Sequence, residues 1–150
     1  KNFSVPTGAR TFEAAAFLRR TGADTVDVKK LFQNNLKDTL QRYQIIQRAR
    51  LYRGDIAIAA LDYTASRTIA AQASDELLNI AGINTSFVLY PDGERVIMSA
   101  RSIGDTNVQM ILEPLGGGGN AATAGCQITG KDMNTVLHEL IASIDKYFEE

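Results

Sequence analysis

The sequence predicts an α/β fold in which a mixed β-sheet is flanked by helices and preceded by a helical linker segment. Three observations support this prediction. Short aliphatic runs are typical of buried strands, stretches with apolar residues at helical spacing separate them, and Pro91-Asp92-Gly93 is a turn typical of a β-hairpin. Strand–helix units and a hairpin therefore occur in one chain, and this combination favours a mixed sheet with helices packed on it.

The N-terminal third is predicted to be helical. Residues 11–20 are strong helix formers that follow a threonine cap and stop before Gly22. Residues 28–53 are predicted to form one long amphipathic helix that ends at Gly54, because Lys and Arg fill the faces between its apolar residues. These apolar residues recur at helical spacing: Leu31, Phe32, Leu36, Leu40 and Tyr43.

The pattern changes after Gly54 to strands that alternate with helices. Ser66 is a predicted helix cap, Gly82 a helix end, and Pro114 halts another helix. We therefore divide the chain into a helical segment, residues 1–53, and a sheet domain, residues 54–150. The predicted strands are 56–61, 85–90, 95–100 and 126–129, and the predicted helices are 68–81, 107–113 and 132–148.

Length and composition restrict the class of protein. The 150 residues are 45% hydrophobic, which is enough for one domain with a core. No run approaches the roughly 20 apolar residues that cross a bilayer, and no signal-peptide pattern opens the chain. The single cysteine, Cys126, cannot form an internal disulfide, which agrees with a reducing cytosol. We expect no membrane contact by this segment and a cytoplasmic location, alone or as the cytoplasmic part of a membrane-anchored protein.

The net charge of −1 conceals an asymmetry. Residues 1–53 hold 11 Lys and Arg against 4 Asp and Glu, whereas residues 54–150 hold 5 against 13. A basic segment attracts nucleic acid or nucleotide, but a solvated helix or an interface to an acidic domain has the same composition. Because the chain begins without methionine, we also expect it to be a piece of a longer protein.

The clearest local signal is the run of four glycines at 116–119. Each glycine ordered in a fold costs roughly 0.5–1 kcal/mol relative to alanine, so an embedded run needs a compensating use. Close approach of the backbone to a ligand is one such use, and consecutive N–H groups can form an anion-binding nest. The alternative is a flexible linker, but the run lies between apolar segments inside the domain. It is not a Walker loop, since no Lys-Ser or Lys-Thr follows.

Two arginines are candidate anion contacts. Arg101 follows a predicted strand in a half of the chain that has few basic residues, and arginine matches phosphate bidentately. A surface salt bridge is the equally simple alternative. Arg67 lies beside a predicted helix N-terminus, where a cation opposes the macrodipole; this indicates an anionic neighbour or only solvent exposure.

No metal or nucleophile constellation is visible in the sequence. The one histidine, His138, lies in the terminal helix at a place suited to structure, and Cys126 lies in an apolar strand without a nearby histidine. We therefore expect no metal bound by this chain and no hydrolysis by it in isolation.

Three segments together resemble the DHHA1 domain of DHH-family phosphoesterases. They are 99–104 (Ser-Ala-Arg-Ser-Ile-Gly), 107–109 (Asn-Val-Gln) and 115–119 (Leu-Gly-Gly-Gly-Gly), in the family's order and spacing. The start, Lys-Asn-Phe, resembles the end of a DHH domain. Segments 10–15 and 75–78 resemble most the GdpP-type cyclic-di-AMP phosphodiesterases within this family.

The resemblance implies a division of labour. A DHH domain of the same chain would hold two manganese ions (Mn²⁺), and this domain would bind a cyclic dinucleotide or short oligonucleotide, making the whole protein a hydrolase. The implied substrate contacts are Arg101, Asn107, Gly116, Gly117, Gly118 and Gly119. The family has a histidine after the glycines, where this chain has Asn120. We expect Asn120 to contact the substrate as a neutral substitute for that histidine, because an amide both donates and accepts hydrogen bonds.

Two other functions stay open at this stage. The domain could bind nucleic acid in an oligoribonuclease or RecJ-like exonuclease, with the basic 29–53 helix contributing. The helical segment could instead serve without catalysis, to form a homodimer or to dock domains.

Overall fold

The structure is a computed structural model that describes residues 25–149, with side chains from residue 35 onward. The predicted helix 11–20 lies outside the described residues. The compact unit that carries the sheet begins at Arg42. No helix within the described part combines the length and the apolar composition required to span a bilayer.

The long helix ends earlier than the sequence predicts. Helix α2 comprises Thr25–Gln47, and strand β1, Ala49–Tyr52, follows it. The prediction of helix through residue 53 was therefore wrong over its last six residues, 48–53. Arg53 and Gly54 both have positive φ, 56° and 87°, and they turn the chain back so that β1 pairs antiparallel with β2. The hydrogen bonds of this hairpin outweigh the helical spacing of the local sequence.

Six strands form one mixed sheet in the order β1-β2-β3-β4-β6-β5. Strands β2 and β3 are parallel, as expected for two strands joined through a helix, and every other neighbouring pair is antiparallel. The predicted mixed α/β fold is confirmed. The remaining strand bounds are Ile56–Ala60 (β2), Thr85–Asp92 (β3), Arg95–Ser102 (β4), Gly118–Gly119 (β5) and Thr123–Thr129 (β6).

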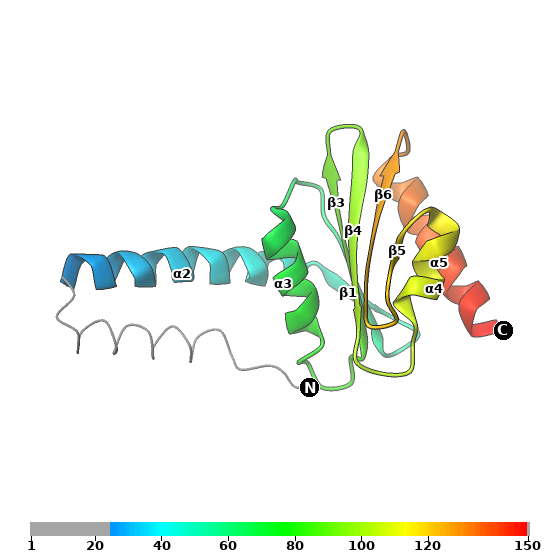
Figure 1. The fold of residues 1–150 in the computed structure, drawn as a ribbon, viewed down its shortest axis with the longest axis horizontal. Coiled ribbons are helices and arrows are strands. Elements are labelled where there is room, and N and C mark those ends of the chain that lie inside the picture. The colour runs from blue at the N-terminus through cyan, green and yellow to red at the C-terminus, as the bar shows by residue number, and fades with distance from the viewer. Residues whose placement is uncertain (1–24, 150) are drawn as a thin grey trace. The chain divides into compact units, whose positions relative to one another are not determined.

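Helices cover the two faces of the sheet unequally (Figure 1). Helix α3, Arg67–Leu77, packs on one face, here called the α3 face, against β3 and β4. Helices α4, Val108–Leu112, and α5, Met133–Glu149, lie on the opposite face, here called the α4/α5 face, and the 3-10 turn Glu113–Leu115 follows α4. Each strand sends alternate side chains to the two faces.

The core consists of one apolar cluster on each face. The cluster on the α3 face is smaller and contains no residue of β6; among its members are Ala57, Ala59, Val88, Tyr90 and Ile97. The cluster on the α4/α5 face takes residues from β2, β3, β4 and β6; among its members are Ile58, Phe87, Leu89, Met98 and Cys126. The face of β6 that points toward the α3 side is therefore left without a helix.

Local signals placed helix starts better than helix ends. Ser66 caps α3, as predicted, because its Oγ accepts a hydrogen bond from the Ile69 N–H at 3.0 Å. The helix ends at Leu77, however, and not at residue 81. The last strand begins at Thr123, three residues before the predicted start, because its first residues pair with β4 and β5.

Candidate functional site

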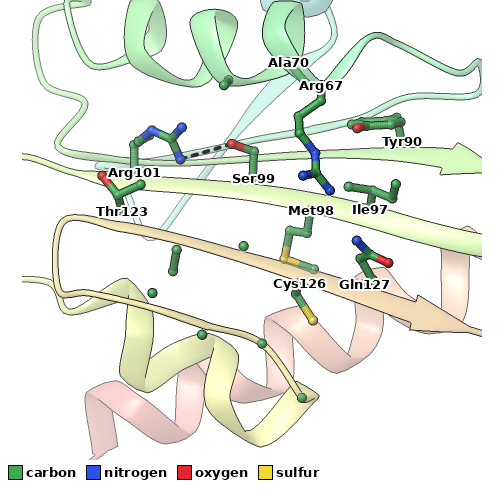
Figure 2. Close-up of a pocket in the computed structure, with 17 residues that line it drawn as sticks. Arg67, Ala70, Tyr90, Ile97, Met98, Ser99, Arg101, Thr123, Cys126 and Gln127 are labelled. Atoms are coloured by element: carbon green, nitrogen blue, oxygen red, sulfur yellow. Dashed lines mark hydrogen bonds between the residues drawn. The ribbon is translucent and has the colours of Figure 1, made fainter.

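A pocket of about 580 Å³ opens on the α3 face, over the part of the sheet that α3 leaves uncovered. Figure 2 shows α3 on one side of this pocket and β6 on the other. The pocket lies over β4, β6 and β5, and its lining includes two arginines but no carboxylate. Arg101 of β4 and Arg67 of α3 therefore give the pocket a cationic lining.

The pairing of β4 with β6 orders the floor into rows. Three register pairs point to the same side of the sheet: Ile97 with Gln127, Ser99 with Gly125, and Arg101 with Thr123. Successive rows on one face are two residues apart, which is about 7 Å along a strand. Because Gly125 has no side chain, the middle row is a shallow trough between two taller rows.

Arg101 is held in place at one end of the trough. Its Nε lies 3.2 Å from a carboxylate oxygen of Asp75 on α3, and its side chain is only 17% exposed. One guanidinium nitrogen donates to the Ser99 Oγ at 3.2 Å and to the Ala100 carbonyl at 2.9 Å, and Figure 2 shows the bond to Ser99. The guanidinium group therefore leans toward the middle of the pocket, with donors oriented before any ligand arrives.

Most of the glycine run is required by the fold itself. Gly116 has φ 89° and ends the 3-10 turn. A Cβ on Gly117 would lie 2.6 Å from the Gly125 carbonyl oxygen, and one on Gly119, where φ is 148°, would lie 2.3 Å from the Thr123 carbonyl oxygen. The N–H groups of Gly116 and Gly117 already donate to the carbonyls of residues 113 and 112. A nest of four free amides, one use that the sequence suggested, is therefore absent from this part of the described chain.

Gly118 differs from its neighbours in the run. A Cβ added to it would have no atom within 4 Å, and its register partner Gly125 would meet only the Met98 carbonyl oxygen, at 3.4 Å. Neither residue has positive φ. Packing and backbone conformation do not require glycine at these two positions, and both line the pocket. Side chains there would stand on the pocket floor.

Two predicted contacts lie outside the pocket lining. The Asn107 side chain caps α4 by accepting from the Met110 N–H at 3.1 Å. The Asn120 Oδ1 accepts from the N–H groups of Ala122 and Thr123, each at 2.9 Å, and so closes the turn before β6. Their substrate contacts stay predictions, since no ligand tests them, and the side-chain oxygens of both serve the local fold.

Several residues that line the pocket were not predicted from the sequence. Tyr90, Ser99 and Gln127 line the pocket together with Arg67, which the sequence had marked only as a weak candidate. The alternation of β4 places Ser99 on the same face as Arg101, so this neighbour could have been found. Tyr90 and Gln127 belong to the site only through strand pairing that the local sequence does not reveal.

The remaining candidates behave as structural residues. Cys126 is buried, its thiol donates to the Leu115 carbonyl at 3.4 Å, and burial raises its pKa, so it is a poor nucleophile. His138 is exposed on α5 and away from the pocket over β4, β6 and β5. Among residues 25–149 no group of three or more His, Cys, Asp or Glu side chains is placed to hold a metal ion.

The basic end of the helical segment is partly neutralised by acidic partners. Arg48 lies 2.7 Å from Asp62 and holds the pKa of that carboxyl below its usual range, by a hydrogen bond and by its charge. Arg53 lies 3.1 Å from Asp145. Because both follow α2 and lie at the β1 hairpin, they do not continue a basic helical stripe. This weakens the expectation of a nucleic-acid-binding helix over residues 29–53.

The structure is an α/β domain with a pocket lined by two arginines and by the glycines of β5 and β6. The DHHA1 domain model matches residues 53–150, and the chain belongs to this family. It is 42% identical over 154 residues to the cyclic-di-AMP phosphodiesterase GdpP of Bacillus subtilis and 38% identical over 152 residues to the cyclic-di-AMP phosphodiesterase PdeA of Listeria monocytogenes. Each match covers 99% of this chain and 23% of the relative, so the chain spans about a quarter of the length of these proteins.

Solved structures share the fold at low identity. The pGpG-specific phosphodiesterase PggH from Vibrio cholerae superposes with a TM-score of 0.59 at 22% identity, covering 97% of this chain and 53% of that one. The manganese complex of RecJ from Thermus thermophilus superposes with a TM-score of 0.57 at 14% identity, covering 80% of this chain and 18% of that one. The family resemblance seen in the sequence is thus confirmed by the family match and by the relatives.

Proposed function

We propose that this chain is the substrate-binding part of a manganese-dependent DHH-family phosphodiesterase that hydrolyses cyclic-di-AMP, or a related dinucleotide, to a linear dinucleotide. The observation that carries this proposal is the 42% identity to GdpP over 99% of the chain, in a fold whose pocket joins Arg101 to the glycine run. Relatives at this identity over the whole chain share a fold, and the pocket supplies the chemistry that a phosphodiester needs.

The metal chemistry belongs to the DHH domain in this proposal. The side chains described here include no donor set for manganese. Paired cations bound by the DHH domain would activate water and stabilise the oxygens of the displaced phosphodiester. The RecJ structures with manganese support metal dependence in the wider family. We assign this chain binding and orientation, and we expect no turnover from it in isolation.

Arg101 and the trough perform the binding and orientation. A guanidinium group fixed by Asp75 and Ser99 offers its remaining donors to one phosphate, and little side-chain entropy is lost on binding because the side chain is already held. The Gly118 and Gly125 backbone leaves room for a flat base or a ribose beside this phosphate. An interaction of this kind positions the scissile bond against metal ions held elsewhere.

The test is the Arg101→Ala variant of the whole protein that carries this chain. A hydrogen bond to a charged group contributes about 1.5–3 kcal/mol, so kcat/KM for cyclic-di-AMP should fall roughly ten- to a hundredfold. Arg50→Ala is the matched control, since Arg50 is exposed on β1 and far in the sheet order from the pocket. An unchanged kcat/KM in Arg101→Ala, with normal thermal unfolding, would refute the assignment.

The other assignments are kept as proposals. We propose a cytoplasmic location and contact with a DHH domain of the same chain, and membership of the DHHA1 family supports both. Binding of longer nucleic acid, as in a RecJ-like enzyme, would require a steep loss of affinity with salt and a dependence on oligonucleotide length.

Homodimerisation through α2 would require an apolar surface, and Leu36, Leu40 and Tyr43 are indeed exposed there. Sedimentation of the whole protein would test it.

A further inference from the structure

Arg67 is the second cation of the pocket, and the proposed function leaves it unused. It is the first residue of α3 and is exposed. Among residues 35–149, its side chain makes neither a hydrogen bond nor an ion pair. Figure 2 shows its side chain reaching from α3 over β4, toward Ile97 and Gln127. An arginine that lines a pocket without a carboxylate, and that no acid neutralises, is available to an anion.

The two arginines lie over different rows of the floor. The Arg101 guanidinium bonds to Ser99, whereas Arg67 extends over the row of Ile97 and Gln127. These two rows are two residues apart on β4, about 7 Å. A single phosphate is too small to lie over both rows at once, but two phosphates joined through one ribose span a comparable length.

We propose that Arg67 is a second phosphate-binding residue of this pocket, which makes the site selective for a dinucleotide with two phosphate groups over ligands with one. The proposal rests on the proposed function and deepens it. Arg101, fixed beside Asp75, holds the phosphate that links the two nucleosides. Arg67, exposed at the start of α3, holds the other phosphate.

The floor between the two arginines is compatible with such a ligand. Gly125 lies in the row of Ser99, and its partner Gly118 continues that row onto β5. The Gln127 Oε1 accepts from Arg95 at 3.1 Å, which leaves its amide N–H groups as donors beside Arg67. A ligand extended from Arg101 to Arg67 would therefore cross bare backbone and meet neutral donors at the second phosphate.

Two linear dinucleotides that differ by one phosphate provide the experiment. The probes are 5′-pApA, which has a terminal and a linking phosphate, and ApA, which has only the linking one. Affinities of the whole protein are measured by calorimetry, and the ligand is checked for integrity by chromatography afterwards. Arg67→Ala should weaken pApA binding about tenfold and ApA binding less than twofold, whereas Arg101→Ala should weaken both.

The outcomes separate this inference from the proposed function. If Arg101→Ala weakens both ligands and Arg67→Ala weakens neither, or weakens both equally, the second phosphate site is refuted and the proposed function stands. If the wild type binds neither ligand, or Arg101→Ala changes nothing, the proposed function fails with it. Arg67→Lys keeps the charge and should recover part of the pApA affinity, and Arg50→Ala should match the wild type for both ligands.

Discussion

The two faces of the sheet differ in how far helices cover them. On the α4/α5 face, buried residues from β2, β3, β4 and β6 form one continuous cluster under two helices. On the α3 face, α3 packs against β3 and β4, Ile45 at the end of α2 joins the same cluster, and no residue of β6 does. The α4/α5 face supplies most of the apolar burial, while the pocket occupies the part of the α3 face that no helix covers. One sheet thus separates stability from binding by how far helices cover each side.

The largest expected effect is a loss of stability from a substitution on the α4/α5 face. Phe87 is fully buried in the α4/α5 cluster. Phe87→Ala removes that packing and leaves a cavity, which costs about 3–5 kcal/mol of unfolding free energy. Urea denaturation measures this loss. A loss of no more than about 0.5 kcal/mol, the range usual for surface substitutions, would contradict the assignment of the main core to this face.

The glycine run sharpens the comparison, because it contains both kinds of position. Gly119→Ala places a Cβ 2.3 Å from a carbonyl oxygen at φ 148° and should cost at least about 1–3 kcal/mol of stability. Gly118→Ala meets no atom within 4 Å and should stay within about 0.5 kcal/mol of the wild type, yet it should weaken dinucleotide binding. Thermal unfolding and calorimetry of the two variants form a matched pair. Equal stability losses would mean that the run is structural throughout.

Asn107 distinguishes a cap from a ligand contact. Its side chain caps α4, so Asn107→Ala should cost about 1 kcal/mol, whereas Asn107→Ser keeps a capping oxygen and should recover most of it. Binding should be normal in the serine variant. If dinucleotide affinity falls tenfold in Asn107→Ser while the melting temperature is unchanged, then Asn107 touches the substrate, as the family resemblance implied.

The smallest expected effect is a pH dependence of the unfolding free energy, which comes from Tyr52 beside the α4/α5-face cluster. The Tyr52 hydroxyl donates to Asp145 on α5 at 2.5 Å, and this hydrogen bond raises the Tyr52 pKa above its ordinary value of 10.0. The neutral phenol is therefore favoured in the folded state, and its stabilisation is present below about pH 10 and lost as pH rises through the folded pKa. The stability difference between wild type and Tyr52→Phe should be constant from about pH 7 to 9 and decline above 10. Tyr43→Phe, at an exposed position, is the control.

The sequence alone determined the local features of this protein. The Ser66 cap depends on one side chain and the N–H group three residues on, and the β3–β4 hairpin depends on a few turn residues, so both could be predicted. The mixed sheet followed from the alternation of such elements. The motif around Arg101 and the glycines also revealed the family, because its three segments lie close together in the chain, within residues 99–119.

Only the tertiary structure decided which residues share a site. Residues 49–52 fit a helix locally but form β1, because β2 offers backbone partners that the local sequence does not reveal. Arg67 and Gln127 line one pocket although 60 positions separate them, since β6 pairs with β4 and α3 packs on β4 but leaves β6 uncovered. The four glycines look alike in the sequence, and only the neighbours packed against each show that Gly118 is free of steric constraint while Gly117 and Gly119 are not. Capping and turns depend on neighbours in the chain, whereas pairing and coverage depend on distant segments.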